Sequence, residues 1–142
     1  MTAKEYLMQY RSAVRRAEAA LDHIAELRAI AERITPVPGG SGGSHTGDRL
    51  GAAVARLVDC EAKLDGEIEL LAAAEHEIMR TICAVQDERL QLVLYRRYIL
   101  GEKWEQIAVN LNLDYRWVLR LHGRALAAVA DVLKEAEQNA AD

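Results

Sequence analysis

Residues 115–124 carry three arginines and no acidic residue. Arg116 and Arg120 are four positions apart, so on a helix both guanidinium groups lie on one face. A guanidinium group can bind O6 and N7 of guanine through two parallel hydrogen bonds, or it can bind a phosphate. The alternative is an exposed helix face whose arginines contact only solvent, and that interpretation is preferred unless a structural motif positions the helix.

The net charge of −4 argues against binding to nucleic acid only if the charge is evenly distributed. Residues 1–85 carry 10 basic and 13 acidic side chains, residues 86–126 carry 7 and 5, and residues 127–142 carry 1 and 4. A phosphate backbone responds to the local field, not to the total charge. The positive middle block is therefore the candidate binding region.

The residues around Asn112 match the pattern of a helix-turn-helix. Ala108 is small enough for two helices to cross closely, Asn112 can adopt the left-handed conformation of the turn, and Val118 fills the space between the helices. Asp114 can cap the second helix. The remaining apolar positions of the motif are Ile107, Leu111, Leu113 and Leu121. The alternative is an ordinary turn within a helical bundle.

The stretch YRRYILGEKWEQIA at residues 95–108, followed by Leu111-Asn112-Leu113, Val118 and Arg124-Ala125-Leu126, resembles region four of bacterial sigma factors. The whole chain is similar to the sigma-region-four-like proteins of phages and prophages, including the ArpU-type late transcription regulators. The resemblance implies a DNA-binding fold and a role in phage or prophage transcription. The chain departs from the family turn, which commonly has Leu-Gly. It also lacks the aromatic, basic helix that captures a melted promoter strand, so we do not expect it to initiate transcription alone.

On this interpretation the second helix of the motif, residues 114–127, lies in the major groove of double-stranded DNA. The predicted contacts on that helix are Tyr115, Arg116, Trp117, Leu119, Arg120 and Arg124, with Gly123 also facing outward. The role of Trp117 stays open, because it could contact thymine methyl groups or pack on the protein.

Three further basic residues are candidates for contacts with phosphate. Lys103 is at the entrance of the first motif helix, where free amide groups also attract an anion. Arg96 and Arg97 could reach phosphates across the groove, or they could pair with Glu102 or Glu105. Trp104 is expected to anchor the core.

The elements that position these residues are predicted to be helical throughout. Phe is absent and only four Thr occur, so strand formers are scarce. A heptad-like helix is expected at residues 3–34, with a capping box between Thr2 and Glu5. After a Gly/Ser-rich connector at residues 35–47, a second helix from Asp48 has an apolar residue at every seventh position from Leu50 to Val85. Val54, Ile68 and Ile82 are expected to fill the second seam position in alternate repeats.

These patterns predict an all-α chain with a long antiparallel helical hairpin at residues 1–85. Residues 86–137 form the helix-turn-helix domain and residues 138–142 a disordered tail. Since residues 86–137 contain an apolar cluster of their own, with both tryptophans, we expect them to fold independently.

Several classes of function are excluded or disfavoured. No apolar run is long enough to span a membrane and no signal peptide precedes the first helix, so a cytoplasmic location is expected, in a bacterial host if the resemblance holds. Cys60 and Cys83 lie about 35 Å apart on one helix, too far for a disulfide. The four histidines lack metal-ligand spacing, and no catalytic arrangement is recognisable. We therefore expect no metal, no cofactor and no enzymatic activity.

The leading hypothesis is a DNA-binding transcriptional regulator that forms a homodimer or higher oligomer through its hairpin, so that two copies contact paired half-sites. One alternative is an adaptor that binds RNA polymerase or another phage protein without contacting DNA. A second is a small terminase-like packaging subunit, although such subunits usually place the DNA-binding unit first in the chain.

Overall fold

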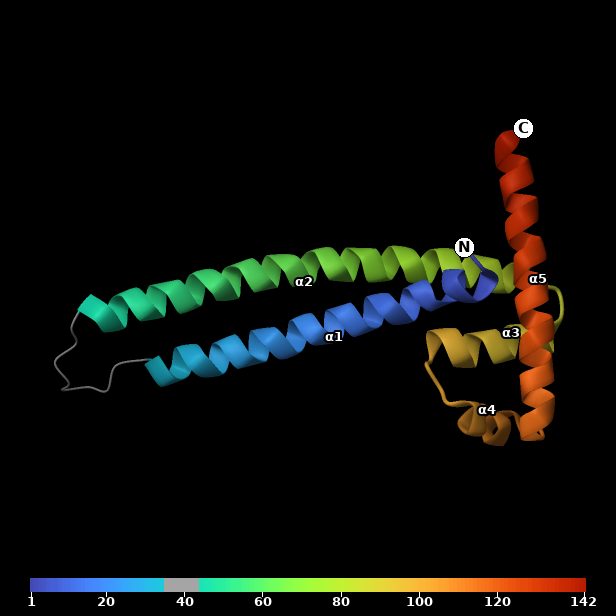
Figure 1. Cartoon of the computed structure of the whole chain (residues 1–142), viewed down its shortest axis with the longest axis horizontal. Helices are drawn as coiled ribbons and strands as arrows, with labels where there is room; N and C mark the ends of the chain where they lie inside the picture. The colour runs from blue at the N-terminus through green and yellow to red at the C-terminus, as the bar shows by residue number, and fades with distance from the viewer. Residues whose placement is uncertain (35–43) are drawn as a thin grey trace. The chain divides into compact units, whose positions relative to one another are not determined.

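The computed structural model describes residues 1–34 and 44–142, and all regular structure in this part of the chain is helical. The elements in chain order are α1 (Ala3–Ile34), α2 (Ser44–Ala84), α3 (Glu88–Leu94), the π-helix η1 (Tyr95–Ile99), α4 (Trp104–Leu111) and α5 (Tyr115–Ala141) (Figure 1). The predicted all-α class is confirmed. Across the described ranges, no helix combines the length and the apolar character needed to cross a bilayer.

The chain divides into two compact units. The core unit contains residues 1–12 and 72–142, and the hairpin unit contains residues 13–71. Both α1 and α2 contribute to both units, so the division differs from the boundary expected at residue 85. Similarly, α5 runs to Ala141, through the residues predicted as a disordered tail. This extension follows from a sequence after Val132 that is rich in Ala, Glu, Leu and Lys, all strong helix formers.

In the hairpin unit, α1 and α2 run antiparallel side by side (Figure 1). Ile24 and Leu27 of α1 are buried, as is Ala53 of α2. The predicted placement of Val54 and Ile68 at the seam is wrong, because these side chains are 45% and 48% exposed. The face of α2 that meets α1 instead includes Ala53, Cys60 and Glu67, whose positions precede the heptad leucines by four residues.

Only the last four residues of the predicted connector, 44–47, belong to the described part of the chain. The part of the predicted flexible connector at residues 35–43 lies outside the described residues. Residues 44–47, which were expected to belong to the same connector, are helical, because α2 begins at Ser44.

The capping box at the start of α1 is confirmed: the Glu5 amide donates to Thr2 Oγ1 at 3.1 Å, and the Thr2 amide donates to Glu5 Oε2 at 3.1 Å.

The core unit is built around one hydrophobic cluster to which five helical segments contribute. Leu7, Ile78, Leu94 and Leu121 are completely buried, and Tyr98 is 1% exposed. The other buried members of this cluster are Tyr6, Ile82, Val85, Leu90, Val93, Ala125 and Val129. The ends of α1 and α2 therefore supply a large part of the core on which α3 and α5 pack.

Polar contacts also connect α1, α2 and α3 within the core unit. The Tyr6 and Thr81 hydroxyls are 2.8 Å apart, and Thr81 donates its hydroxyl proton to the Glu77 carbonyl at 3.3 Å, so Tyr6 is the donor to Thr81. Gln91 of α3 donates to the Cys83 carbonyl at 3.3 Å and to the Val85 carbonyl. These bonds satisfy carbonyl groups that the end of α2 leaves without intrahelical partners.

The shared core reverses the expectation that residues 86–137 fold independently. A fragment of these residues lacks Leu7, Ile78 and Ile82, which are at most 2% exposed in the full chain. Complete burial of such side chains contributes about 1.5–3 kcal/mol each, which together is a large share of the roughly 5–15 kcal/mol of a typical domain. We expect the fragment to show no cooperative thermal transition by circular dichroism, whereas the full chain melts cooperatively. A fragment transition as sharp as that of the full chain would contradict the shared core.

Candidate nucleic-acid interface

The turn between α4 and α5 has the geometry that the motif requires. Asn112 has φ 54° and ψ 46°, the left-handed conformation that few residues other than Gly adopt. The Leu113 amide donates to the Ala108 carbonyl at 2.9 Å, and the Asn112 amide donates to the Val109 carbonyl at 3.1 Å. These bonds close the end of α4 in a Schellman-type arrangement. The prediction of Asn at the turn is confirmed.

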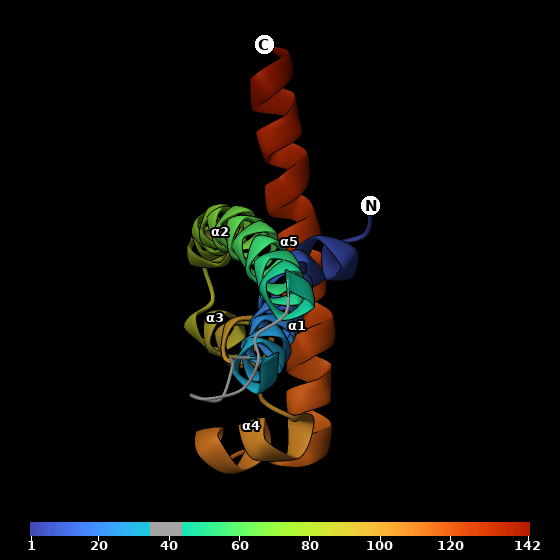
Figure 2. The same ribbon diagram turned by 90° about the vertical axis from the view of Figure 1, so that its left-hand side faces the viewer.

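Asp114 begins the second helix of the motif. Its backbone is extended, and its Oδ1 accepts a hydrogen bond from the Arg116 amide at 2.9 Å. Between the two helices lie Ile107 and Val118, both completely buried, and Ala108, which is 8% exposed. Figure 2 shows α4 beside the start of α5. The predicted helix-turn-helix contacts are therefore present.

The segment that leads into α4 turns at Gly101. This residue has φ 72°, and a Cβ atom there would lie 2.5 Å from the guanidinium carbon of Arg11. The positive φ favours glycine at this position, whereas a Cβ atom would displace only the flexible end of the Arg11 side chain. Immediately before it, the Leu100 amide donates to the Tyr95 carbonyl at 3.0 Å, which closes the π-helical turn η1. No local residue pattern marks this π-helix, so it was not predictable from the sequence.

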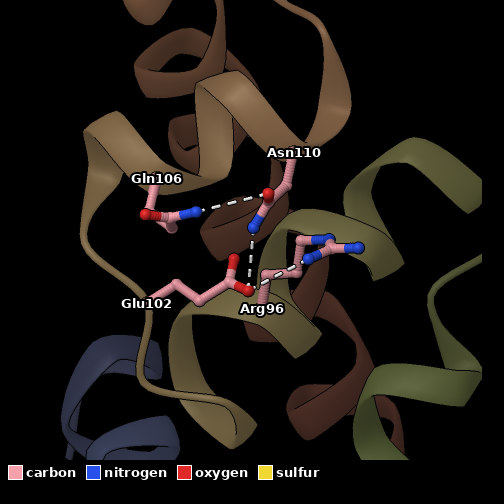
Figure 3. Close-up of polar contacts among 4 residues, drawn as sticks. All are labelled: Arg96, Glu102, Gln106 and Asn110. Carbon is pink, nitrogen blue, oxygen red and sulfur yellow. Dashed lines mark hydrogen bonds and ion pairs between the residues drawn. The ribbon is translucent and has the colours of Figure 1, made fainter.

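Arg96 forms an internal ion pair. Its Nη1 lies 3.0 Å from Glu102 Oε1, and the two side chains are 29% and 17% exposed. Asn110 donates to the same carboxylate oxygen at 3.0 Å, and Gln106 donates to Asn110 Oδ1 at 3.3 Å (Figure 3). Of the two roles left open for Arg96, the structure thus places it with Glu102. This network joins η1 to α4 through the loop that precedes α4.

Arg97 also makes contacts within the core unit. Its guanidinium carbon lies 4.4 Å from the centroid of the Trp104 ring, and its Nη1 donates to the Glu102 carbonyl at 3.0 Å. Trp104 packs against both hydrophobic clusters, as expected of a residue that anchors the core. Arg97 is consequently held across the first residue of α4 and is not directed outward as a separate phosphate contact.

His122 also lies beside Trp104, with ring centroids 4.4 Å apart. Its Nε2 shares a hydrogen bond of 2.7 Å with the Tyr98 hydroxyl. Burial, together with the positive charges of Lys4 and Arg97, lowers the pKa of His122 from 6.5 to about 4. Burial also raises the pKa of Tyr98. His122 is therefore neutral at pH 7 and serves as a packing and hydrogen-bonding residue, a role that sequence analysis missed because Tyr98 is 24 residues away.

The outward side of α5 carries arginines that, unlike Arg96 and Arg97, are exposed. We define the α5 outer face as Tyr115, Arg116, Leu119, Arg120 and Gly123, all of which are exposed. Within residues 1–34 and 44–142, the side chains of Arg116 and Arg120 form no ion pair or hydrogen bond. Asp114, the nearest acid along the chain, accepts a bond from a backbone amide instead. Two guanidinium groups therefore point to solvent without a carboxylate partner in the described chain.

The remaining predicted residues lie at the margins of this face. Trp117 is partly buried against the core, and the Arg124 guanidinium carbon lies 5.3 Å from the centroid of its ring. Lys103 is exposed and holds the N-cap position of α4 without a side-chain capping bond. The structure thus favours the packing role for Trp117 and leaves the Lys103 ammonium group accessible beside the free amides of a helix N-terminus.

The partly buried, neutral state of His122 makes the stability of the core unit pH-dependent. Since the folded-state pKa is about 4, the unfolded chain binds more protons between pH 6.5 and about 4. The stability due to neutral His122 is fully present above pH 6.5 and is lost as the pH falls towards 4. We expect the melting temperature of wild type to fall over this range more than that of His122→Gln, which keeps an acceptor for Tyr98. A loss of about 1 kcal/mol lowers the melting temperature of a chain of this size by roughly 2–4 °C.

Scanning calorimetry at several pH values measures this difference, and His76→Gln is the matched control because His76 is exposed on α2. Parallel pH profiles for wild type and His122→Gln would show that His122 does not cause the effect.

Comparison of the chain with protein-family models, with curated proteins and with solved structures finds no match. The interface is therefore assigned from its geometry and chemistry.

Proposed function

We propose that this chain is a sequence-specific DNA-binding transcriptional regulator of phage or prophage type, with the start of α5 in the major groove. The observation that carries the proposal is the pair of unpartnered guanidinium groups, Arg116 and Arg120, on the exposed side of the second helix of a helix-turn-helix. Their spacing of four residues places both on one face. From that face each guanidinium can bind guanine O6 and N7 or a phosphate.

The contacts inside the core unit support a rigid presentation of this face. Val118 and Leu121, which alternate with the outer-face residues along α5, are completely buried. The Asp114 cap defines where α5 begins. Rigid placement lowers the entropy cost of binding, so base contacts from Arg116 and Arg120 retain more of their free energy.

Phosphate contacts are assigned to Lys103 and to the first amides of α4. These groups lie at the start of α4, the first helix of the motif, and in helix-turn-helix proteins the first helix crosses the DNA backbone. Arg96 and Arg97 take no direct part in this proposal, because Glu102 and Trp104 engage them. Their role is to hold α4 in position.

The hairpin unit is assigned to protein contacts, either with a second copy of the chain or with a partner such as RNA polymerase. Its exposed apolar side chains support this assignment, because burying them against a partner removes apolar area from water. These side chains are Leu21, Val54, Val58, Ile68 and Leu70. The same observation favours the second candidate function, an adaptor that binds proteins through the hairpin and does not contact DNA.

Replacing the two outer-face arginines distinguishes these functions. Each substitution, Arg116→Ala or Arg120→Ala, is expected to weaken binding to the preferred duplex by about 1–3 kcal/mol when a base contact is lost. Loss of a phosphate contact is expected to lower the slope of log K against log salt by about 1. Neither change should alter the melting temperature appreciably, because both side chains are exposed.

The preferred duplex is first obtained by selection from random sequences, and its affinity is then titrated at two salt concentrations. Arg49→Ala/Arg56→Ala is the matched control, since it removes two exposed arginines from the hairpin unit. If selection with wild type enriches no sequence, and the Arg116/Arg120 double variant binds as the control does, the adaptor replaces the DNA-binding function.

Gly123 provides a second test of the outer face. A Cβ atom at this position would meet nothing within 4 Å in the described structure, and the residue is helical. Gly123→Ala should therefore stabilise the protein by about 0.5–1 kcal/mol. We expect it nevertheless to weaken DNA binding several-fold, because the methyl group projects from the face that approaches the duplex.

Gly66→Ala is the matched control, because Gly66 is also an exposed helical glycine with open space around it. Both variants should unfold at higher denaturant concentration, but only Gly123→Ala should lose affinity. Unchanged affinity for Gly123→Ala would mean that DNA does not approach this part of α5.

A further inference from the structure

A cysteine and a histidine from different helices meet in the hairpin unit. Cys60 Sγ of α2 lies 3.6 Å from His23 Nδ1 of α1, within hydrogen-bonding distance for sulfur. The two residues are 37 positions apart in the chain, so only the pairing of the helices brings them together. A thiol beside an imidazole is the arrangement in which a nucleophile can pass its proton to a neighbouring base.

The pair lies at a solvent-accessible cavity of about 300 Å³, which is also lined by Arg16, Lys63 and Glu67. Arg16 Nε lies 3.1 Å from Glu67 Oε2, so these two charges compensate each other. The Lys63 ammonium group has no carboxylate partner among the residues that line the cavity. The side chains of Arg16, Lys63 and Glu67 thus give the cavity a net positive charge.

A metal site is not favoured by the same residues. In the described part of the chain, no group of three or more His, Cys, Asp and Glu side chains is placed to hold a metal ion. Structural zinc needs four ligands and catalytic zinc three from the protein. Proton transfer from Cys60 to His23 is therefore the chemistry that the pair can support by itself.

The second cysteine supplies an internal comparison. Cys83 is more exposed than Cys60, which is only partly accessible. It lies in the core unit, and no histidine contact of its thiol is found in the described residues. If exposure alone controlled reactivity, Cys83 would react first.

We propose that Cys60 is a site of covalent modification by small anionic disulfides, with His23 as the proton acceptor and Lys63 as the group that attracts the anion. His23 Nδ1 takes the thiol proton while Cys60 Sγ attacks one sulfur of the disulfide. A new S–S bond forms, the original S–S bond breaks, and the leaving thiolate takes up the proton from His23. Cys60 is oxidised to a mixed disulfide, and the leaving sulfur is reduced to a free thiol.

The test treats the full-length protein with glutathione disulfide at pH 7, quenches with acid, and measures the adducts at Cys60 and Cys83 by peptide mass spectrometry. General-base assistance typically raises a reaction rate by at least 100-fold. Partial burial of Cys60 slows its reaction and offsets part of this gain. We therefore expect Cys60 to react at least about tenfold faster than Cys83. His23→Gln should reduce the Cys60 rate to the Cys83 rate or below and leave Cys83 unchanged. Because His23 is exposed, the variant should retain the helix content of wild type by circular dichroism.

Two further measurements test the role of Lys63 and guard against a loss of structure in the histidine variant. Cystamine, a cationic disulfide, should show a smaller preference for Cys60, because His23 still assists but Lys63 no longer attracts the reagent. Lys63→Gln should slow the reaction with glutathione disulfide but not with cystamine. If His23→Gln lowers the helix content, His23→Asn replaces it in the same comparison. Equal rates at Cys60 and Cys83 in wild type, or an unchanged ratio in the histidine variants, would overturn the proposal.

Discussion

The helix-turn-helix depends on a hydrophobic core that it does not build alone. Only Ile107, Ala108 and Val118 form the buried cluster between α4 and α5. Such a small cluster cannot offset the conformational entropy of ordering two helices and a turn. α5 provides the remaining stabilisation because its apolar stripe continues through Leu121 and Val129 into the larger cluster, where the ends of α1 and α2 also contribute.

Arginine has two roles in the core unit: some arginines form contacts within the protein and others are exposed. The surroundings of each side chain decide between these roles. Arg96 and Arg97 come from the π-helical turn, where Glu102 and Trp104 are within reach. Arg116 and Arg120 come from the outward side of α5, and their guanidinium groups find no partner among the described residues. A protein with a net charge of −4 can thus present a locally positive face, because its acids are placed elsewhere or are engaged in caps and ion pairs.

In the hairpin unit, the rotation of α2 about its axis has consequences for both packing and chemistry. Because α2 turns Ala53 and Cys60 towards α1, Val54 and Ile68 remain on the surface. The same rotation brings Cys60 to His23. The rotation of α2 would then explain both proposals. It leaves apolar side chains exposed for protein contacts, and it places the Cys60 thiol beside a base.

The sequence by itself determined the features that arise within one or two helical turns. The capping box of Thr2 and Glu5, the positive φ of Asn112, the cap by Asp114 and the burial of Val118 all depend on near neighbours in the chain. Residue type and spacing were therefore sufficient to predict them. Only the tertiary structure decided the contacts between distant residues: the pairing of Arg96 with Glu102 over its alternatives, the bond of Tyr98 to His122, the meeting of Cys60 with His23, and the sharing of Leu7 and Ile78 with α5. These contacts depend on the rotation and crossing of whole helices. A periodic pattern marks an apolar face but does not specify which neighbour covers it.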